Sequence, residues 1–300
     1  MPNPVAYLII CHTDPAQLER LIDAVDEQAD FFIHVDSKVP IEQFAFLAAR
    51  PNVFFTTERV WIYWAGLSMV RATLTLMSAA VEKGQYRRLV LLGGLDYPIK
   101  PTSQILDVLL GDDNREFIRF FDIVESKEEV YLELIERYWF FDAPRLFVNK
   151  YYDVREQAKR FLWPLKKRHL RGYNLCFGHM QWALTGDCAS YVLDFARTHP
   201  ELEKFYRYSF APDEQFIHTI VANSRFCDNA GGIEPYRAMG TYLMANLHHI
   251  HPSLSKTYTI DDFDEIASSD KLFVKKITSG DSAELIARID AELRNEVQED

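Results

Sequence analysis

The chain has 300 residues, of which 48% are hydrophobic and 14% aromatic, and its formal net charge is −11 at pH 7. This composition is sufficient for a large core, and the acidic balance excludes general nucleic-acid binding through bulk charge. The four cysteines are scattered without paired spacing, no apolar run reaches membrane length, and the opening lacks the basic region of a secretion signal. We therefore expect a soluble, cytoplasmic protein with reduced thiols and no nucleic-acid partner.

Strands and helices alternate along the first hundred residues. Short apolar runs predict buried strands at Val5–Ile10, Phe31–Val35, Val53–Phe55 and Arg88–Leu92. Apolar residues at helical spacing predict helices at Gln17–Gln28 and Ser68–Val81. This alternation is typical of a parallel α/β layer of the nucleotide-binding type.

Polar residues stand where the predicted strands end. His34 and Asp36 follow one strand, and Asp96 follows another. Ligands bind at the carboxyl ends of such strands, although a loop Asp is equally often a helix cap or turn residue. Gly93-Gly94 is followed by Leu-Asp-Tyr-Pro, so neither a dinucleotide fingerprint nor a Walker sequence is present.

The middle of the chain is basic and aromatic. Residues 145–171 contain nine Lys or Arg against two acidic residues, interleaved with Phe, Tyr and Trp. One interpretation is contact with an anionic surface, either lipid headgroups or a phosphorylated glycan. The other is a solvated basic helix whose aromatic side chains face the core.

A strand is expected over Gly178–Thr185, followed by a helix over Cys188–Ala196. The segment Ser209–Ser224 then predicts one further helix, with Pro212 at its first position and Asp213 and Glu214 in its first turn. Taken alone, those two carboxylates are most simply charges at a helix N-terminus. A carboxylate at such an edge can also serve as a general base.

The tail offers weak metal ligands and several cations. Asp262-Phe-Asp264 formally matches an acidic metal-binding triplet, but Thr259 stands three residues before Asp262 and predicts a capping box instead. His248, His249 and His251 are expected to line a polar cleft rather than to bind a metal. Without a metal, lysines can neutralise a departing diphosphate, and Lys256, Lys271, Lys275 and Lys276 are the candidates.

Seven segments in order resemble the glycosyltransferase family that contains the core 2 and I-branching beta-1,6-N-acetylglucosaminyltransferases and the peptide O-xylosyltransferases (glycosyltransferase family 14). They are Ala6–His12, Phe32–Lys38, Trp64–Val70, Leu91–Lys100, Gly178–Thr185, Ala211–Thr219 and Leu272–Lys276. The resemblance implies a GT-A type α/β fold with a Rossmann-like nucleotide-binding half, in a variant that works without a metal. It also implies an inverting single displacement that uses a UDP-sugar donor.

The same resemblance assigns roles to individual residues. Glu214 is the general base, His34 and Asp36 hold the uridine, and Asp96 lies by the donor sugar. Lys276 neutralises the diphosphate, and Lys256 is our choice for the second cation, with Lys271 or Lys275 as alternatives. On the acceptor side stand Gln181 and Trp182, whose ring would stack on a sugar.

Departures from the family bear on the acceptor. The vertebrate members carry an anchor and disulfides, and we expect neither in this protein, which resembles a bacterial, cytoplasmic member. We expect one domain over residues 1–300, with a nucleotide-binding half at 1–110 and an acceptor and catalytic half at 111–300. The expected activity is transfer of N-acetylglucosamine to a glycan or glycolipid of the cell surface, with residues 145–171 touching the inner membrane face. The alternatives are transfer of xylose, a metal-dependent transferase using Asp262 and Asp264, and a non-catalytic glycan- or nucleotide-binding module.

Overall fold

A five-stranded sheet forms the centre of the fold. The structure is a computed structural model that describes residues 3–111, 114–142, 161, 168–238 and 240–295. The strand order is β3-β2-β1-β4-β8, with β1 at Val5–Cys11, β2 at Ala29–Val35, β3 at Val53–Phe55, β4 at Arg88–Gly93 and β8 at Ala183–Thr185. The first four strands run parallel, and β8 closes one edge in antiparallel pairing with β4.

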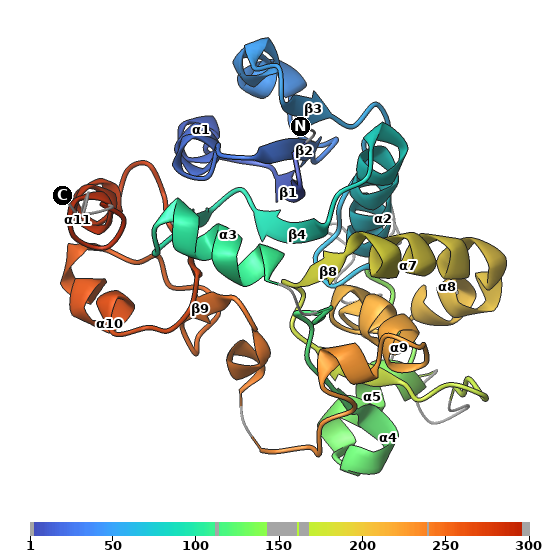
Figure 1. The fold of residues 1–300 in the computed structure, drawn as a ribbon. Helices are drawn as coiled ribbons and strands as arrows, with labels where there is room; N and C mark the ends of the chain where they lie inside the picture. Colours follow the sequence, from blue (N-terminus) through green and yellow to red (C-terminus); the bar gives the residue numbers. More distant parts are fainter. Residues whose placement is uncertain (1–2, 112–113, 143–160, 162–167, 239, 296–300) are drawn as a thin grey trace.

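Alternating side chains give this sheet two buried faces. Ala6, Leu8 and Leu91 pack in one cluster with α2 (Leu67–Lys83) and α7 (Gly186–Thr198). Tyr7, Ile9 and Leu92 point the other way, into a cluster with α1 (Pro15–Ala24) and α3 (Thr102–Leu110). A strand covered on both sides is apolar without interruption, which is why β1 reads as a continuous hydrophobic run. Figure 1 shows α2 and α7 on one side of the sheet and α1 and α3 on the other.

Two small sheets extend this layer towards the C-terminal half. One has the order β5-β10-β9, with β5 at Asp96–Pro98, β10 at Phe273–Lys275 and β9 at His248–Ile250. The other pairs β6 (Phe120–Asp122) with β7 (Cys176–Gly178). The remaining helices are α4 (Ile123–Ser126), α5 (Glu129–Glu136), α8 (Pro200–Tyr206), α9 (Phe216–Ala222), α10 (Phe263–Ala267) and α11 (Ala283–Glu292). Short 3-10 turns lie at Ile41–Ala49, Pro212–Glu214, Asp228–Ala230, Thr241–Met244 and Ile260–Asp262.

The predicted α/β class and the early strands are confirmed, and two later elements differ. The strand expected over residues 178–185 is two strands, because a loop at residues 179–182 separates β7 from β8. The single helix expected over residues 209–224 is a 3-10 turn followed by α9. The two are separated at Gln215, whose φ of −135° is not helical.

Most of the basic stretch at 145–171 lies outside the described residues, so its predicted membrane contact stays a prediction. Among the helices that the structure describes, none combines the length and the hydrophobicity needed to cross a bilayer.

Candidate functional site

Glu214 lies in a tightly held turn rather than in a regular helix. Ala211 has a positive φ of 46°, and its N–H donates to the carbonyl of Ala65 at 3.1 Å. The fully buried Gln215 side chain reaches back and donates to the carbonyls of Phe210 and Ala211. The backbone before Glu214 is therefore fixed from two sides, and the Glu214 side chain remains half-buried. The carboxylate is therefore held in place by the backbone and partly shielded from water.

The two carboxylates of this turn are both protonated more readily than free ones. Burial raises the pKa of Asp213, and burial together with the neighbouring Asp213 charge raises the pKa of Glu214. The ammonium of Lys275 acts on both groups in the opposite direction and lowers each pKa. Lys275 therefore lies close enough to Asp213 and Glu214 to share one electrostatic environment with them.

Lys275 is brought there by the pairing of β5 with β10. In this antiparallel pair, Lys275 stands opposite Asp96. Asp96 is fully buried, and its Oδ2 accepts from the N–H of Gly93 at 2.7 Å and from Nε2 of His248 at 3.1 Å. Among the described residues, the other oxygen, Oδ1, has no hydrogen-bond partner, and neither has Nδ1 of His248. Buried polar atoms are rarely left in this state unless a ligand or water completes them.

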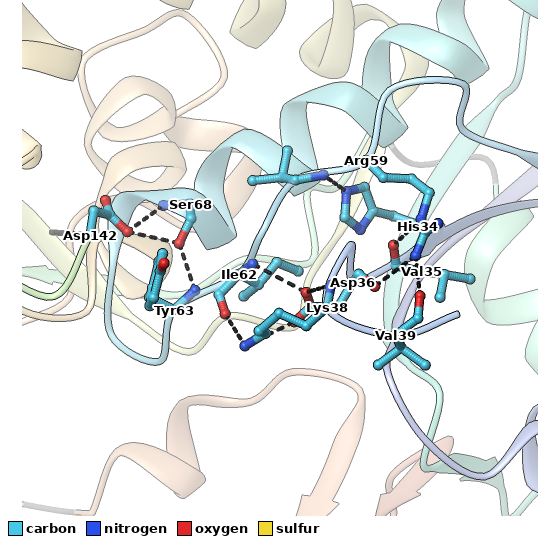
Figure 2. A network of polar contacts seen from close by, with 11 residues as sticks. His34, Val35, Asp36, Lys38, Val39, Arg59, Ile62, Tyr63, Ser68 and Asp142 are labelled. Atoms are coloured by element: carbon cyan, nitrogen blue, oxygen red, sulfur yellow. Dashed lines mark hydrogen bonds and ion pairs between the residues drawn. The ribbon is translucent and has the colours of Figure 1, made fainter. Parts of the chain in front are cut away.

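At the carboxyl end of β2, His34 holds the following loop. Its Nε2 accepts from the N–H of Val60 at 2.9 Å, and burial lowers the pKa of the ring. His34 is therefore neutral and carries its proton on Nδ1, because the other nitrogen is already an acceptor. That Nδ1 is buried, and no described residue hydrogen-bonds to it. Figure 2 shows the ring turned towards the segment that carries Arg59.

Asp36 and Arg59 complete this polar network, which we call the β2 network. One Asp36 oxygen accepts from the N–H groups of Lys38 at 3.0 Å and Ile62 at 3.4 Å, and the other pairs with the Lys38 ammonium at 3.2 Å. Arg59 donates to the carbonyls of Val35, Asp36 and Val39 (Figure 2). Both oxygens of Asp36 are therefore used to hold the loops at Lys38 and Ile62 in place.

The loop between β7 and β8 contains the two residues expected on the acceptor side. Gln181 is 2% exposed, and no described residue hydrogen-bonds to either polar atom of its amide. Trp182 is 1% exposed and packs within the larger core cluster. A fully buried ring has no free face, so the structure differs here from the expected stacking of Trp182 on a sugar.

The lysines expected to serve the diphosphate lie in different surroundings. The Lys256 ammonium is engaged by Asp262, which also accepts from the N–H of Thr259 at 2.9 Å. The capping box predicted at Thr259 and Asp262 is therefore confirmed. In the part of the chain that the structure describes, no group hydrogen-bonds to the ammonium of Lys275 or of Lys276. Lys275, which the sequence offers only as an alternative, is the lysine that acts on the carboxylates.

Metal ligands do not gather in this site. Among the described residues, no three His, Cys, Asp or Glu side chains are grouped so that they could hold a metal ion. Sequence reasoning also overlooked His179 and His218, which are joined by a hydrogen bond from the His218 ring in α9 to the backbone carbonyl of His179 in the β7–β8 loop. Only their position in segments 178–185 and 211–219 of the family resemblance could have indicated them.

Comparison with known proteins gives a family match over most of the chain. Residues 5–266 match the model of the Core-2/I-Branching enzyme family. Human xylosyltransferase 2 is 26% identical over 238 residues, which is 76% of this chain and 25% of the relative. A beta-1,3-galactosyl-O-glycosyl-glycoprotein beta-1,6-N-acetylglucosaminyltransferase from Bos taurus is 33% identical over 125 residues, which is 38% of this chain and 29% of the relative.

The chain spans about a quarter of the length of the curated relatives it matches first. Among solved structures, the galactosyltransferase LgtC, in complex with donor and acceptor sugar analogues, overlaps 98% of this chain and 98% of its own. The identity is 11% and the TM-score 0.40.

Proposed function

The chain belongs to the Core-2/I-branching enzyme family, and from this premise we propose that it is an inverting glycosyltransferase that uses a UDP-sugar. The observation that carries the proposal is the placement of Glu214. Its carboxylate is held in a fixed turn, half-buried, beside Asp213 and within the influence of Lys275. A base with a raised pKa, next to a cation that no described group pairs, fits an acid–base reaction with an anionic leaving group.

In this reaction an acceptor hydroxyl attacks the anomeric carbon of the donor sugar. The new bond joins the acceptor oxygen to that carbon, and the bond between the carbon and the phosphate oxygen breaks. Glu214 takes the proton of the hydroxyl, and the electron pair of the broken bond leaves with UDP. Burial and Asp213 keep Glu214 basic enough to accept the proton near neutral pH, which is the range in which a general base is most useful.

Cations of the chain are proposed to neutralise the leaving diphosphate. Lys275 supports this role best, because its charge reaches the carboxylates and none of the described groups hydrogen-bonds to its ammonium. Lys276 remains the lysine that the family resemblance assigns. Lys256 is less well placed, since Asp262 already binds it.

The β2 network is proposed to shape the uridine side of the site. His34 and Asp36 organise the loop at residues 59–62 through its backbone, and Asp96 lies at the same carboxyl edge of the parallel strands. Gln181 remains a candidate on the acceptor side because its amide is unpaired.

The transferred sugar has two candidates. N-acetylglucosamine is the sugar in the name of the bovine relative, which aligns with 38% of this chain. Xylose is favoured by the extent of similarity, since xylosyltransferase 2 aligns with 76% of the chain. The proposed acceptor is a glycan or glycolipid of the cell surface, reached from the cytoplasmic side of the membrane.

A panel of UDP-sugars tests the proposal directly. Hydrolysis and transfer are measured for wild type and Glu214→Gln, with and without excess EDTA. We expect one UDP-sugar to be consumed by the wild type in EDTA, and Glu214→Gln to bind it without turnover. Equal binding and biological effect in both proteins, with no turnover in either, would favour the non-catalytic module. Loss of activity in EDTA, restored by a divalent cation, would show that a metal is required.

A further inference from the structure

His179 lies in the β7–β8 loop with one ring nitrogen already occupied. The side chain is 6% exposed, and its Nδ1 accepts from the N–H of Gln181 at 3.3 Å. A peptide N–H can only donate, so Nδ1 must offer its lone pair. In the neutral ring the proton therefore sits on Nε2, which makes Nε2–H a hydrogen-bond donor.

The backbone at this position is fixed against the segment that carries Glu214. His218 of α9 donates its Nε2–H to the carbonyl of His179 at 3.0 Å. A Cβ on the preceding Gly178 would stand 2.1 Å from the carbonyl oxygen of Arg119 and 2.5 Å from the His218 ring. Because the loop is packed this closely onto α9, the His179 backbone keeps a defined position relative to Glu214, which only Gln215 separates from that helix.

Its surroundings keep the ring uncharged. Burial, together with the charges of Lys275, His248 and His218, lowers the pKa of His179 well below its ordinary value. The pairing of β5 with β10 places Lys275 opposite Asp96, which accepts from His248, and both Lys275 and His248 act on the His179 ring. Among the described residues, none accepts a hydrogen bond from Nε2 of His179.

We propose that His179 donates this Nε2–H to a phosphate oxygen of the leaving nucleoside diphosphate, beside the ammonium of Lys275. The inference rests on the proposed function and adds a phosphate ligand to it. A phosphate beside Lys275 gains a hydrogen bond from a neutral donor without a second positive charge being forced against the first. The alternative partner for Nε2–H is a sugar hydroxyl, and the experiment separates the two.

Two substitutions isolate the donor. His179→Leu removes it, whereas His179→Gln keeps an amide N–H of similar reach. Because a hydrogen bond to a charged group contributes about 1.5–3 kcal/mol, we expect His179→Leu to lower both UDP affinity and kcat/KM for the UDP-sugar by ~10–100-fold. His179→Gln restores most of this loss, and the control His199→Leu, at the junction of α7 and α8, changes neither quantity. Affinities for uridine, UMP and UDP are measured by calorimetry on all four proteins.

A spectroscopic measurement on the wild type needs no substitution. In protein labelled with ¹⁵N-histidine, we expect the His179 Nε2–H resonance to move when UDP is added and to stay in place with uridine. If His179→Leu leaves UDP affinity unchanged and raises only the KM of the UDP-sugar, the donor serves a sugar hydroxyl and the phosphate assignment is wrong. If UDP binds but none of these quantities responds to His179, this inference fails while the proposed function stands. If the wild type binds neither UDP nor any UDP-sugar, the proposed function fails and the inference with it.

Discussion

Two polar regions of this molecule satisfy their hydrogen bonds to different degrees. In the β2 network, both oxygens of Asp36 and the guanidinium of Arg59 are engaged by the chain itself, and Nδ1 of His34 is the buried atom left over. Around Glu214 the balance is reversed. Asp96, His248, Gln181 and Asp213 each keep a buried atom that no described residue pairs, and no described group hydrogen-bonds to the Lys275 ammonium.

The difference separates a region that holds shape from one that is open to a ligand. A paired network fixes a loop and gives little to a substrate, whereas unpaired buried groups cost stability until something binds them. Substitutions should therefore cost activity in the Glu214 region and free energy of unfolding in the β2 network or the core. The predictions that follow test this division.

The largest effect is expected from Glu214→Gln. A general base contributes ~10²–10⁴-fold to a rate, so kcat falls by that factor while the Kd of the UDP-sugar changes little.

The stability of Glu214→Gln, in contrast, should increase. Because the pKa of Glu214 is raised by folding, the favourable contribution of its proton is complete at low pH and is lost as pH rises through the raised value. The amide carries no charge to desolvate, so the melting temperature at pH 8 rises, by about 2–4 °C for each kcal/mol recovered. If the melting temperature at pH 8 falls instead, the buried carboxylate of Glu214 stabilises the fold, and the proposed division between a structural and a ligand-binding region is wrong.

Trp182→Ala should lower the stability of the fold rather than remove a contact with the acceptor. The ring is among the largest fully buried side chains, so its removal costs about 3–5 kcal/mol in the free energy of unfolding. Denaturant titration measures this loss, with Trp182→Phe as a smaller control truncation. If Trp182→Ala instead keeps its stability and loses only acceptor affinity, the ring reaches the substrate after all.

Asp36→Asn probes the paired region. An amide can replace one acceptor oxygen but gives up the ion pair with Lys38, and it leaves one of the donors now held by Asp36 with a weaker partner. We expect a loss of about 1–3 kcal/mol in the free energy of unfolding. Thermal melts with and without UDP measure it, and a stability equal to that of the wild type would show that the network is not structural.

The pH profile of the wild type should show the raised pKa of Glu214. The base works only when deprotonated, so kcat/KM falls about tenfold for each pH unit below that pKa. The acid limb therefore lies at higher pH than an exposed glutamate would give. Removing Lys275, whose charge lowers this pKa, should move the limb further up, so Lys275→Gln is compared with Lys271→Gln in the same buffers. If the acid limb of Lys275→Gln lies at the same pH as that of the wild type, the charge of Lys275 does not influence the pKa of Glu214.

The smallest effect is expected from Lys256→Ala. Its ion pair with Asp262 is open to solvent on the lysine side, where water screens the attraction and such pairs contribute little. Its kcat/KM should fall less than that of Lys275→Ala, measured with the same UDP-sugar. If Lys256→Ala instead loses more kcat/KM than Lys275→Ala, Lys256 is the lysine that neutralises the diphosphate.

The predictable part of the fold was the part that local pattern determines. The strand at Val53–Phe55 and the capping box at Thr259 and Asp262 depend on neighbouring residues, and both were found. The break at Gln215 depends on carbonyls that its own side chain reaches back to bind, and no apolar periodicity reports such a bond. Trp182 has an aromatic side chain in either role, so only packing could show that it belongs to the core.

Site residues divide in the same way. His34, Asp36 and Asp96 could be proposed because they follow strands of one parallel sheet. The preference for Lys275 over Lys256 could not, because it depends on Asp262 binding one lysine and on β10 bringing the other opposite Asp96. Their roles in catalysis and binding remain proposals until the variants are measured.

The pairing that surrounds Asp96 also determines when this site can exist. Asp96 meets His248 across 152 residues of sequence, and β10 ends at Lys275, beyond the last residue of the family match. During synthesis, the first strands of the large sheet can pair long before these partners have been made. A nascent chain therefore contains Asp96 before His248 and Lys275 have been synthesised. Its carboxylate stays solvated until both are present. The proposed transfer site would then be completed only after β10 has been made, and a ribosome stalled before β10 would carry a folded sheet that lacks Lys275.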